Sequence, residues 1–511
     1  MEVAGFYLIL ILIIVAASFL IWLLFSGVWS YRRLCHIPTP SRLAGLSYLW
    51  LGYITWSGKQ YWVHRDLHKK YGPLVRIGPN EVMTDDPEIL KKVASTNSTY
   101  RRAEWYLTGR FNPYFDNLFT ILDPIPHQKA KQRSMPAYLG RETPGLDVII
   151  NDKVKLLIKV LCDRHLTSDP GQNPPLVNLG VITNYFTMDV ITHLGFGHET
   201  GYLRDDQDHY RFLEGVRRLW PQMSTVSEVP WMRRALFSTP MLKLFGPKHT
   251  DKEGFGALMG AAREHVNRRF ELGEGKKSDM LETFIKLGFN RQECESEGLF
   301  LLLSGTESTA CAMRQILVHA ITAPAIYDMV KEEIMRACRE GSVSYPITMV
   351  EAKKLPCLQA IIYEGIRMRP PLLGTFPKVV PSSGETFHGH FIPAGTSICT
   401  NGSSLLRSKT LFGNDAEVYN PMRFIHLEKS KREEMERNVE LTFGYGQWMC
   451  AGKTIAFMEM NKVIFELLRH FNIQLVDPLK PCDVKSYGVF LEPNLYVRIT
   501  KDQNVSLGVK A

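Results

Sequence analysis

The N-terminal segment of the chain is almost entirely apolar. No charged residue occurs in residues 3–31, and the run at residues 6–25 is long enough to cross a bilayer as one helix. Aromatic residues and the pair Arg32 and Arg33 follow it, which is typical of a membrane interface with a cytoplasmic flank. A cleaved signal peptide is the alternative, but the run is too long for an h-region and lacks a basic n-region. We therefore expect a transmembrane helix at residues 1–31, anchoring a cytosolic body at residues 32–511.

Beyond this anchor, apolar residues recur mainly at three- and four-residue spacing, which is typical of helices packed on a core. The spacing predicts helices through most of the chain up to residue 475, the most regular of them at residues 454–471. Residues 64–95 read as a helix, two short strands and a helix, and alternating runs predict further strands near residues 373–380, 387–399 and 487–499. The pattern predicts a mostly α fold with small β regions in one body, because no linker rich in Pro, Gly or Ser divides it.

Composition narrows the classes of function. The chain has 511 residues, and its net charge of +9 is spread without a block rich in Lys and Arg. That distribution suits an anionic membrane surface or an acidic protein partner and does not indicate nucleic-acid binding. The nine cysteines are odd in number and unclustered, which favours a reducing compartment over a disulfide framework or a cysteine-rich zinc site. Gly195, Gly197 and Gly201 loosely match a dinucleotide loop, but a helical pattern precedes them, so we expect no bound nicotinamide or flavin.

One cysteine stands in an unusual setting. Cys450 lies in the glycine-rich stretch FGYGQWMCAGK, residues 443–453, directly before the most regular helical pattern. Backbone N–H groups and the positive end of a helix dipole at such a place favour a thiolate. With no second cysteine close by, this residue suits neither a disulfide nor a zinc site. Three interpretations stay open: a nucleophile, the axial ligand of a haem iron, or an inert cysteine in a turn before a core helix.

The spacing within this stretch resembles the haem-binding loop of the cytochrome P450 monooxygenases. Phe443, Gly446, Cys450 and Gly452 fit its pattern F-x-x-G-x-x-x-C-x-G. The resemblance implies that Cys450 is the axial ligand of the haem iron and that its neighbours, Trp448 included, contact the haem. Glycines let the backbone approach a flat macrocycle and direct N–H groups at the sulfur.

A polar stretch at residues 304–309 interrupts a long apolar helical pattern. Glycine and several hydroxyl residues destabilise a helix interior, although small residues admit a flat cofactor and hydroxyls can open the backbone ladder to a water. The stretch resembles the P450 oxygen-activation motif A/G-G-x-D/E-T-T, and a polar kink in a core helix is the alternative. The resemblance implies roles for five residues: Ser304 and Gly305 over the distal haem face, Glu307 as the acid, Ser308 in place of the usual threonine, and Thr309 beside it.

Glu364 and Arg367 share one face of an otherwise apolar helical pattern and can pair there. A solvated surface pair is the commoner arrangement, but a buried pair needs a further partner, and Arg423 can provide it. The set resembles the E-x-x-R and P-x-R-F elements of the P450 family. By that resemblance it braces the cysteine loop.

The expected clamp for the haem propionates departs from the family pattern. The position two before the cysteine is commonly basic, whereas here it is Trp448, whose indole donates one hydrogen bond and carries no charge. His127, Lys131 and Lys378 are candidate replacements, Arg133 is a further one, and solvated charges are the alternative for all of them.

The resemblance extends over essentially the whole chain after the anchor. Residues 71–82, YGPLVRIGPNEV, resemble the first β-hairpin of fungal members, and residues 36–40 resemble the proline-rich hinge of membrane-bound ones. It implies the cytochrome P450 fold, haem b, and electrons from NADPH through a separate reductase or a cytochrome b-type donor. It also implies an endoplasmic reticulum membrane protein that oxidises a lipophilic small molecule, such as a fungal terpenoid, polyketide or alkaloid intermediate.

Two rival functions stay open. One is a haem-thiolate isomerase or dehydratase that uses a peroxide and no reductase, and the other is a catalytically silent haem-binding protein. Apolar residues in four segments are expected to line the substrate pocket: residues 105–122, 219–245, 372–376 and 488–491. Ordinary core or surface loops are the alternative for each of these residues.

Overall fold

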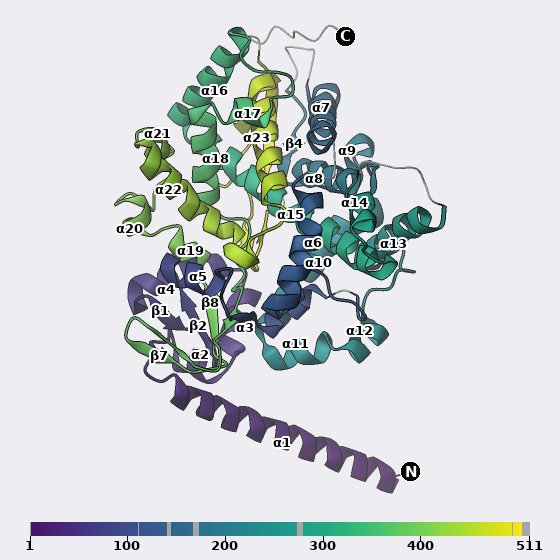
Figure 1. The fold of residues 1–511 in the computed structure, drawn as a ribbon, viewed down its shortest axis with the longest axis vertical. Helices are drawn as coiled ribbons and strands as arrows, with labels where there is room; N and C mark the ends of the chain where they lie inside the picture. The colour runs from purple at the N-terminus through teal and green to yellow at the C-terminus, as the bar shows by residue number, and fades with distance from the viewer. Residues whose placement is uncertain are drawn as a thin grey trace.

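The computed structural model describes residues 2–110, 112–140, 145–166, 173–272, 279–492 and 494–502. Figure 1 shows a large helical part, a smaller part rich in strands next to it, and one long helix, α1 (Glu2–Arg33), that extends from the strand-rich side. The mostly α fold with small β regions is therefore confirmed.

Eleven helices of at least twelve residues make up most of the body that the structure describes. They are α6 (Pro124–Tyr138), α7 (Leu146–His165), α8 (Leu179–Phe196), α10 (Phe212–Glu228), α13 (Gly254–Leu272), α15 (Arg291–Ile321), α16 (Pro324–Arg339), α18 (Pro356–Met368), α22 (Lys429–Glu440) and α23 (Lys453–His470), with α4 (Gln60–Tyr71) in the strand-rich part. The shorter ones are α2 (Arg42–Leu46), α3 (Leu49–Trp56), α5 (Pro87–Ala94), α9 (Tyr202–Asp205), α11 (Pro230–Leu236), α12 (Thr239–Phe245), α14 (Met280–Lys286), α17 (Met349–Ala352), α19 (Gly402–Leu405), α20 (Lys409–Phe412) and α21 (Met422–Ile425).

The strands form small sheets. The largest has the order β1-β2-β8-β5-β3, with strands β1 (Leu74–Arg76), β2 (Glu81–Thr84), β8 (Ser397–Thr400), β5 (Lys378–Val379) and β3 (Arg101–Arg102). A second has the order β4-β12-β9, with strands β4 (Val177–Asn178), β12 (Tyr496–Lys501) and β9 (Phe471–Leu475). Two hairpins complete the set: β6 (Glu385–Phe387) with β7 (His390–Ile392), and β10 (Lys485–Ser486) with β11 (Phe490–Leu491).

The central core joins five long helices. Helix α15 packs along α8 and also against α18 and α23, while α7 packs on α8 and α23. Their apolar side chains form one continuous buried cluster, which includes Phe186, Met313 and Phe465. Because the polar stretch of α15 and the start of α23 both border this cluster, the core fixes the two elements that carry the candidate chemistry.

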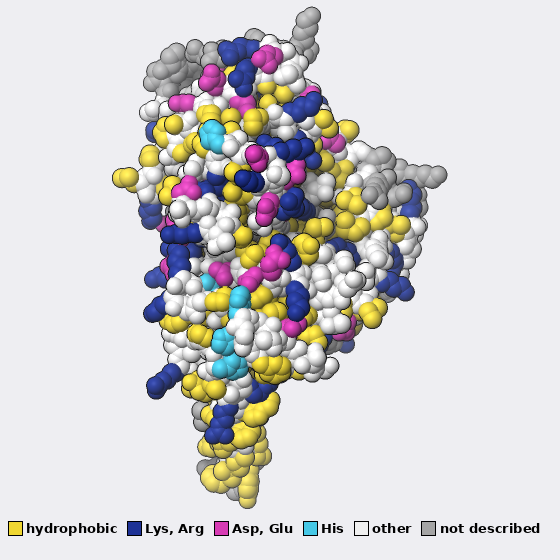
Figure 2. Space-filling view, turned by 60° about the vertical axis from the view of Figure 1, so that its left-hand side comes forward, with side chains coloured by type: hydrophobic (Ala, Val, Ile, Leu, Met, Phe, Trp, Pro, Cys, Tyr) yellow, Lys and Arg dark blue, Asp and Glu magenta, His cyan; other side chains and the backbone are white. Residues whose placement is uncertain are grey.

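Helix α1 stands apart from the body. Within Gly5–Arg33, a window of 18 residues has a mean hydropathy of 3.2 and no buried residue, so this helix is long and apolar enough to cross a membrane. Figure 2 shows its apolar surface projecting from the body. The buried guanidinium of Arg76 ties its end to β1 by donating to the Tyr31 carbonyl at 3.2 Å, and the Arg76 N–H donates to the Pro38 carbonyl at 2.7 Å. The helix runs two residues past the expected boundary at residue 31.

The predicted element boundaries were less accurate than their types. The hairpin expected near residues 71–82 is confirmed as β1 and β2. The prediction of helix up to residue 475 was wrong, because α23 ends at His470 and the next five residues pair with β12. Most of residues 373–380 is irregular, with only the two residues of β5 in a strand. Gly197 ends α8 with a φ of +80°, so this glycine caps a helix and does not open a dinucleotide loop.

Candidate functional site

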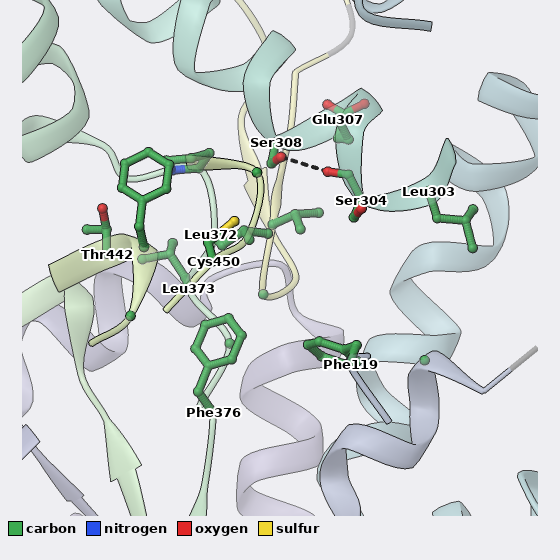
Figure 3. Close-up of a pocket in the computed structure, with 18 of the residues that line it drawn as sticks. Phe119, Leu303, Ser304, Glu307, Ser308, Leu372, Leu373, Phe376, Thr442 and Cys450 are labelled. Atoms are coloured by element: carbon green, nitrogen blue, oxygen red, sulfur yellow. Dashed lines mark hydrogen bonds between the residues drawn. The ribbon is translucent and has the colours of Figure 1, made fainter. Parts of the chain in front are cut away.

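A cavity of about 470 Å³ lies between α15 and the loop that carries Cys450. Its wall is mainly apolar and aromatic, with Phe119, Leu372, Leu373 and Phe376 prominent. Figure 3 shows these side chains, Cys450 and the polar residues of α15 around one space. The two motifs that the sequence places almost 150 residues apart therefore border the same cavity.

The cysteine loop is held by backbone contacts that only glycine permits. The Cys450 N–H donates to the Phe443 carbonyl at 2.6 Å, which closes the loop. Gly446 has a φ of +53°, and a Cβ there would lie 2.3 Å from the Ala94 carbonyl oxygen. The Gln447 amide donates to two carbonyls, those of Ser95 and Ser98, each at 3.1 Å. The loop is therefore locked against the end of α5.

The Cys450 side chain is exposed to the cavity. Desolvation raises the pKa of its thiol, while the N–H groups of Gly452 and Lys453 and the charge of Lys131 lower it. The N–H groups at the start of α23 therefore favour the thiolate, in the direction that the sequence predicts, and the cavity wall opposes them. A bound cation would favour the thiolate further.

Hydroxyl groups in the middle of α15 bond back along the helix. Ser308 Oγ donates to the Ser304 carbonyl at 3.0 Å, as the dashed line in Figure 3 shows, and Thr306 Oγ1 donates to the Leu302 carbonyl at 2.6 Å. The Thr306 carbonyl accepts from Thr187 Oγ1 of α8 at 3.0 Å. Ser304, Ser308 and Thr309 all line the cavity, so the predicted motif does present its hydroxyls there.

Gly305 serves a different contact from the expected one. A Cβ at this position would lie 2.7 Å from Cγ1 of Ile191 on α8. Its missing side chain thus allows α15 and α8 to approach each other closely. The expectation that this glycine makes room for a flat cofactor was wrong in its reason, although Gly305 also borders the cavity.

Glu307 lines the cavity, but its carboxylate points away from Cys450 (Figure 3). Its Oε1 accepts from Arg314 Nη2 at 2.5 Å, and its Oε2 accepts from Asn184 Nδ2 at 2.6 Å. Arg314 also donates from Nε to Glu492 at 3.0 Å. Burial lowers the pKa of this guanidinium, but the two carboxylates more than compensate and keep it well above its usual value. Glu307 is therefore one end of a buried acid–base network.

A second group of polar side chains lies on the opposite wall, next to Trp448. Five residues line the cavity here: Arg102, His127, Lys131, Lys378 and Trp448. The His127 and Trp448 rings lie 4.4 Å apart, and the Arg102 guanidinium lies 4.5 Å from the Trp448 ring. Lys131 donates to the Gln447 and Met449 carbonyls, and Lys378 donates to the Tyr106 hydroxyl. We call this set the basic cluster.

The basic cluster has cations without an anion. No described carboxylate forms an ion pair with Arg102, Lys131 or Lys378, and buried Nε of Arg102, Nδ1 of His127 and Nε1 of Trp448 accept or donate no hydrogen bond. Burial lowers the pKa of Arg102 to about 10 and that of Lys131 to about 8. Burial and the three cations lower the pKa of His127 to about 2, so this imidazole is neutral. Such a cluster is built to receive an anionic group.

Arg133 does not belong to this cluster. Its guanidinium pairs with both oxygens of Glu293, at 3.0 and 2.9 Å, and lies 3.8 Å from the Phe289 ring. It therefore joins α6 to the start of α15, and its assignment as a propionate ligand was wrong.

The predicted triad of Glu364, Arg367 and Arg423 is assembled and buried. Arg367 binds both oxygens of Glu364, at 2.7 and 2.8 Å, and Arg423 Nε donates to Glu364 at 3.2 Å. Further N–H groups of Arg367 donate to the carbonyls of Leu406, Ala416 and Val418. The triad thus fixes the irregular chain between α19 and α21 directly.

Its link to the cysteine loop is indirect. Tyr363, one residue before Glu364, donates to Glu440 at 3.0 Å, and Lys453 Nζ donates to the same carboxylate at 2.6 Å. The rings of Tyr363 and Phe443 both pack on Phe457. The path from the triad to Cys450 therefore runs through Glu440 and the start of α23.

The four segments expected to line the pocket contribute unequally. Residues 105–122 supply Trp105, Phe119 and their neighbours, and residues 372–376 and 488–491 also reach the cavity. Of residues 219–245, only the part up to Glu228 lines it. The rest, α11 and α12, turns outward, where Trp231 packs on Phe19 of α1 and Phe245 is exposed. That part of the prediction was wrong.

The sequence matches the cytochrome P450 family over residues 42–498. The chain belongs to the cytochrome P450 family. It is 68% identical over 488 residues to cytochrome P450 monooxygenase abl1 of Leptosphaeria maculans, which covers 94% of this chain and 86% of that protein. Over 467 residues it is 61% identical to cytochrome P450 monooxygenase aba1 of Botryotinia fuckeliana, with coverages of 91% and 92%. It is 38% identical over 488 residues to ABA1 of Pyricularia oryzae, with coverages of 94% and 95%.

These matches identify a P450 monooxygenase similar to proteins of fungi. The family uses a haem cofactor and electrons from a redox partner. The residues present fit a haem. The described wall of the cavity includes the Cys450 thiol, the glycine-containing loop that carries it, and a basic cluster without an anion.

Two sets of residues at the site escaped sequence reasoning. In the sequence, nothing distinguishes Arg102 from its neighbour Arg101. Only the fold buries Arg102 and places it in the basic cluster. Arg314 and Glu492 are buried partners of Glu307, and no local spacing joins Glu492 to a residue so distant in the chain. The sequence offers one signal for Arg314: a charged residue within an apolar helical segment, which predicts a buried charge with a partner.

Proposed function

We propose that the chain is a membrane-anchored haem-thiolate monooxygenase that inserts one oxygen atom of O₂ into a lipophilic small molecule. The observation that carries the proposal is the shared cavity, with the Cys450 sulfur on one wall and the Ser304, Ser308 and Thr309 hydroxyls on another. By the resemblance to fungal P450s, the substrate is a secondary-metabolite intermediate.

Each part of the site has a role in this proposal. Cys450 is the axial ligand, and Phe443, Gly446 and Gly452 shape the loop beneath the haem. The basic cluster, with Arg102 added to the four predicted residues, holds the propionates by charge and hydrogen bonds. A bound haem b supplies dioxygen binding and electron storage, which no side chain of the chain provides.

The polar residues of α15 handle protons. Glu307 borders the cavity, and Arg314 and Asn184 fix the orientation of its carboxylate by hydrogen bonds. Ser308 and Thr309 also line the cavity and carry hydroxyls. We propose that protons pass from Glu307 to these hydroxyls, which would deliver them into the cavity. The apolar wall orients the substrate and excludes bulk water.

The remaining parts of the proposal concern location and electrons. Helix α1 spans the endoplasmic reticulum membrane once and leaves the body, residues 32–511, in the cytosol, where an NADPH-dependent reductase or a cytochrome b-type donor supplies electrons. Exposed apolar residues on α11 and α12, beside α1, support a body that rests on the membrane.

Consumption of NADPH and O₂ tests the reaction class. Membranes holding the protein and a reductase are supplied with a pool of lipophilic candidate substrates, and NADPH, O₂ and product are measured together. Consumption of NADPH and O₂ in equal amounts, with one product formed per NADPH, supports a monooxygenase. Turnover of an added peroxide without NADPH would establish the isomerase or dehydratase alternative, and haem binding without any turnover would favour the silent protein.

A further inference from the structure

One carboxylate in the cavity wall has no part in the chemistry described so far. Glu228 ends α10, lines the cavity and is 6% exposed. The described cavity residues include three carboxylates, namely Glu228, Glu307 and Glu459. Glu307 is held by Arg314 and Asn184, and Glu459 lies on α23, the helix that follows Cys450. Glu228 is therefore the carboxylate on the α10 side of the cavity.

Glu228 is held in a fixed orientation by an aromatic wall. Trp105 Nε1 donates to Glu228 Oε1 at 3.1 Å. The Trp105 ring lies 5.5 Å from the Phe376 ring and 6.3 Å from the Phe119 ring, and a Cβ on Gly374 would lie 2.8 Å from it. Since the indole is packed on several sides, its N–H fixes one carboxylate oxygen. The Thr375 hydroxyl is a second hydrogen-bond donor to this carboxylate. A carboxylate has about four acceptor positions, so two donors leave about half of its capacity for a ligand.

The charge of Glu228 already has a partner outside the cavity wall. The buried guanidinium of Arg233 acts on it electrostatically and also acts on Glu81, a half-buried carboxylate. Burial raises the pKa of Glu228 to about 7, while Trp105, Arg233 and Thr375 oppose that effect and Glu81 adds to it. Because Arg233 provides the counter-charge, a ligand does not have to be a cation to bind here.

The surroundings of Glu228 are otherwise suited to hydrocarbon. Neighbouring cavity residues on α10 and the aromatic wall include Trp220, Met223, Phe119 and Phe376. An apolar cavity with one fixed acceptor orients a ligand by the single donor that meets it. A neutral hydroxyl provides such a donor and can satisfy the free oxygen of Glu228 without adding a buried charge.

We propose that Glu228 binds a hydroxyl group of the substrate, so that the substrate is a lipophilic alcohol already oxygenated at one end. This proposal rests on the proposed function and names the substrate class of the same cavity. It also makes Glu228 a specificity-determining residue. The reaction that supplies the substrate must then be one that forms an alcohol, such as hydrolysis of an ester or an earlier hydroxylation.

The test compares ligands that differ in one group. The full-length holoprotein in nanodiscs is titrated with 1-decanol, with its methyl ether 1-methoxydecane, and with decanoate. Binding is followed by the shift of the ferric Soret band and, independently of the haem, by equilibrium dialysis of radiolabelled ligand. We expect 1-decanol to bind about ten-fold more tightly than the ether, as a charge-assisted hydrogen bond predicts.

Three variants decide the matter. Glu228→Gln should remove the preference for the alcohol and improve binding of decanoate, because the anionic acceptor is replaced by an amide donor. Glu81→Gln is the matched control, since this half-buried carboxylate also acts on Arg233 but does not line the cavity, and it should keep the preference. Trp105→Phe keeps the ring, removes the N–H that orients Glu228, and should reduce the preference several-fold.

A preference that persists in Glu228→Gln, or that Glu81→Gln removes equally, would overturn the proposal. Failure of the proposed function would look different. The wild-type protein would then show no thiolate-ligated haem in its carbon-monoxide spectrum, while dialysis would still report which ligand binds.

Discussion

Two buried carboxylate–arginine networks lie within this chain, and they differ in how completely their members are enclosed. In the triad of Glu364, Arg367 and Arg423, the side chains of Glu364 and Arg367 are 0% exposed. In the network of Glu307, Arg314 and Glu492, Arg314 and Glu492 are equally buried, but the Glu307 side chain is 17% exposed at the cavity. One network is closed and the other has an open end.

Their partners explain the difference. Arg367 donates to three backbone carbonyls of the chain between α19 and α21, so the triad uses its hydrogen bonds to fix irregular backbone. Arg314 instead donates to side chains, those of Thr183 and Asn184 on α8 among them. A closed network stabilises a fold, whereas an open one keeps a charged group available to the cavity. Similar residues thus fix backbone in one place, and in the other they border the cavity, where we propose a role in proton transfer.

The largest effect is expected from breaking the closed network. Arg367→Ala removes two hydrogen bonds from the buried carboxylate of Glu364. The loss should lower the free energy of unfolding by about 3–5 kcal/mol. We expect almost no haem-loaded protein, measured as haem per protein after expression and by thermal unfolding. Arg133→Ala is the control, since it breaks a two-pronged but half-exposed pair with Glu293 and should cost about 1 kcal/mol or less. Normal haem loading in Arg367→Ala would contradict the structural role.

A smaller and different effect is expected from breaking the open network. Glu492→Gln leaves Arg314 with Glu307 as its one remaining anionic contact, apart from amide and hydroxyl partners. Arg314 should then hold the Glu307 carboxylate more tightly in its present orientation, so that proton transfer into the cavity becomes slower. We predict normal haem content, a roughly 10- to 100-fold lower product rate, and a larger solvent isotope effect. Loss of haem comparable with that in Arg367→Ala would show that both networks are structural.

The hydroxyls of α15 should matter less individually than together. Ser308→Ala and Thr309→Ala each keep one of the two neighbouring hydroxyls, whereas the double variant keeps neither. We expect the double variant to consume NADPH while forming several-fold less product, with the difference appearing as peroxide. A double variant that matches the wild type in product per NADPH would remove both residues from the proton route.

The smallest expected effect is on the pH dependence of the protein's stability, through Glu297. Burial raises the pKa of Glu297 to about 8, with the neighbouring Glu293 adding to the shift and the Leu118 N–H, which donates to it at 2.6 Å, opposing it. The neutral form is therefore preferred in the folded state, and its contribution to stability is lost as pH rises from about 4.5 to 8. Glu297→Gln keeps an acceptor for Leu118 and cannot ionise.

We expect this variant to match the wild type at pH 5 and to exceed it at pH 8 by about 1 kcal/mol, which shifts Tm by about 1–2 °C. Thermal unfolding at the two pH values measures the difference. An equal gain or loss at both would show that Glu297 does not titrate in this range.

The same comparison shows what could be predicted from the sequence. Glu364 and Arg367 are three residues apart on an apolar helix, so local spacing reveals the pair, and Cys450 is marked by its glycines. The fold class followed from apolar periodicity for the same reason. Local patterns report local geometry well.

Arg314, Glu492 and Arg102 were out of reach because each meets its partners through the fold. Glu492 lies 178 residues from Arg314 in the chain, and Arg102 lies 4.5 Å from the ring of Trp448, which is also distant in the chain. The outward turn of α11 and α12 was missed because an apolar segment beside a membrane and one that lines a cavity have the same composition. The end of α23 was misplaced because the residues after His470 pair with the distant strand β12, and no local pattern shows that pairing.

The most direct test is the carbon-monoxide difference spectrum of the reduced, membrane-bound protein, recorded beside Cys450→Ser. We predict a strongly red-shifted Soret band in the wild type and its loss in the variant, with haem still bound through the basic cluster. A wild-type protein that binds haem but lacks the band, or a variant that keeps it, would contradict ligation by Cys450 and with it the monooxygenase chemistry proposed for this site.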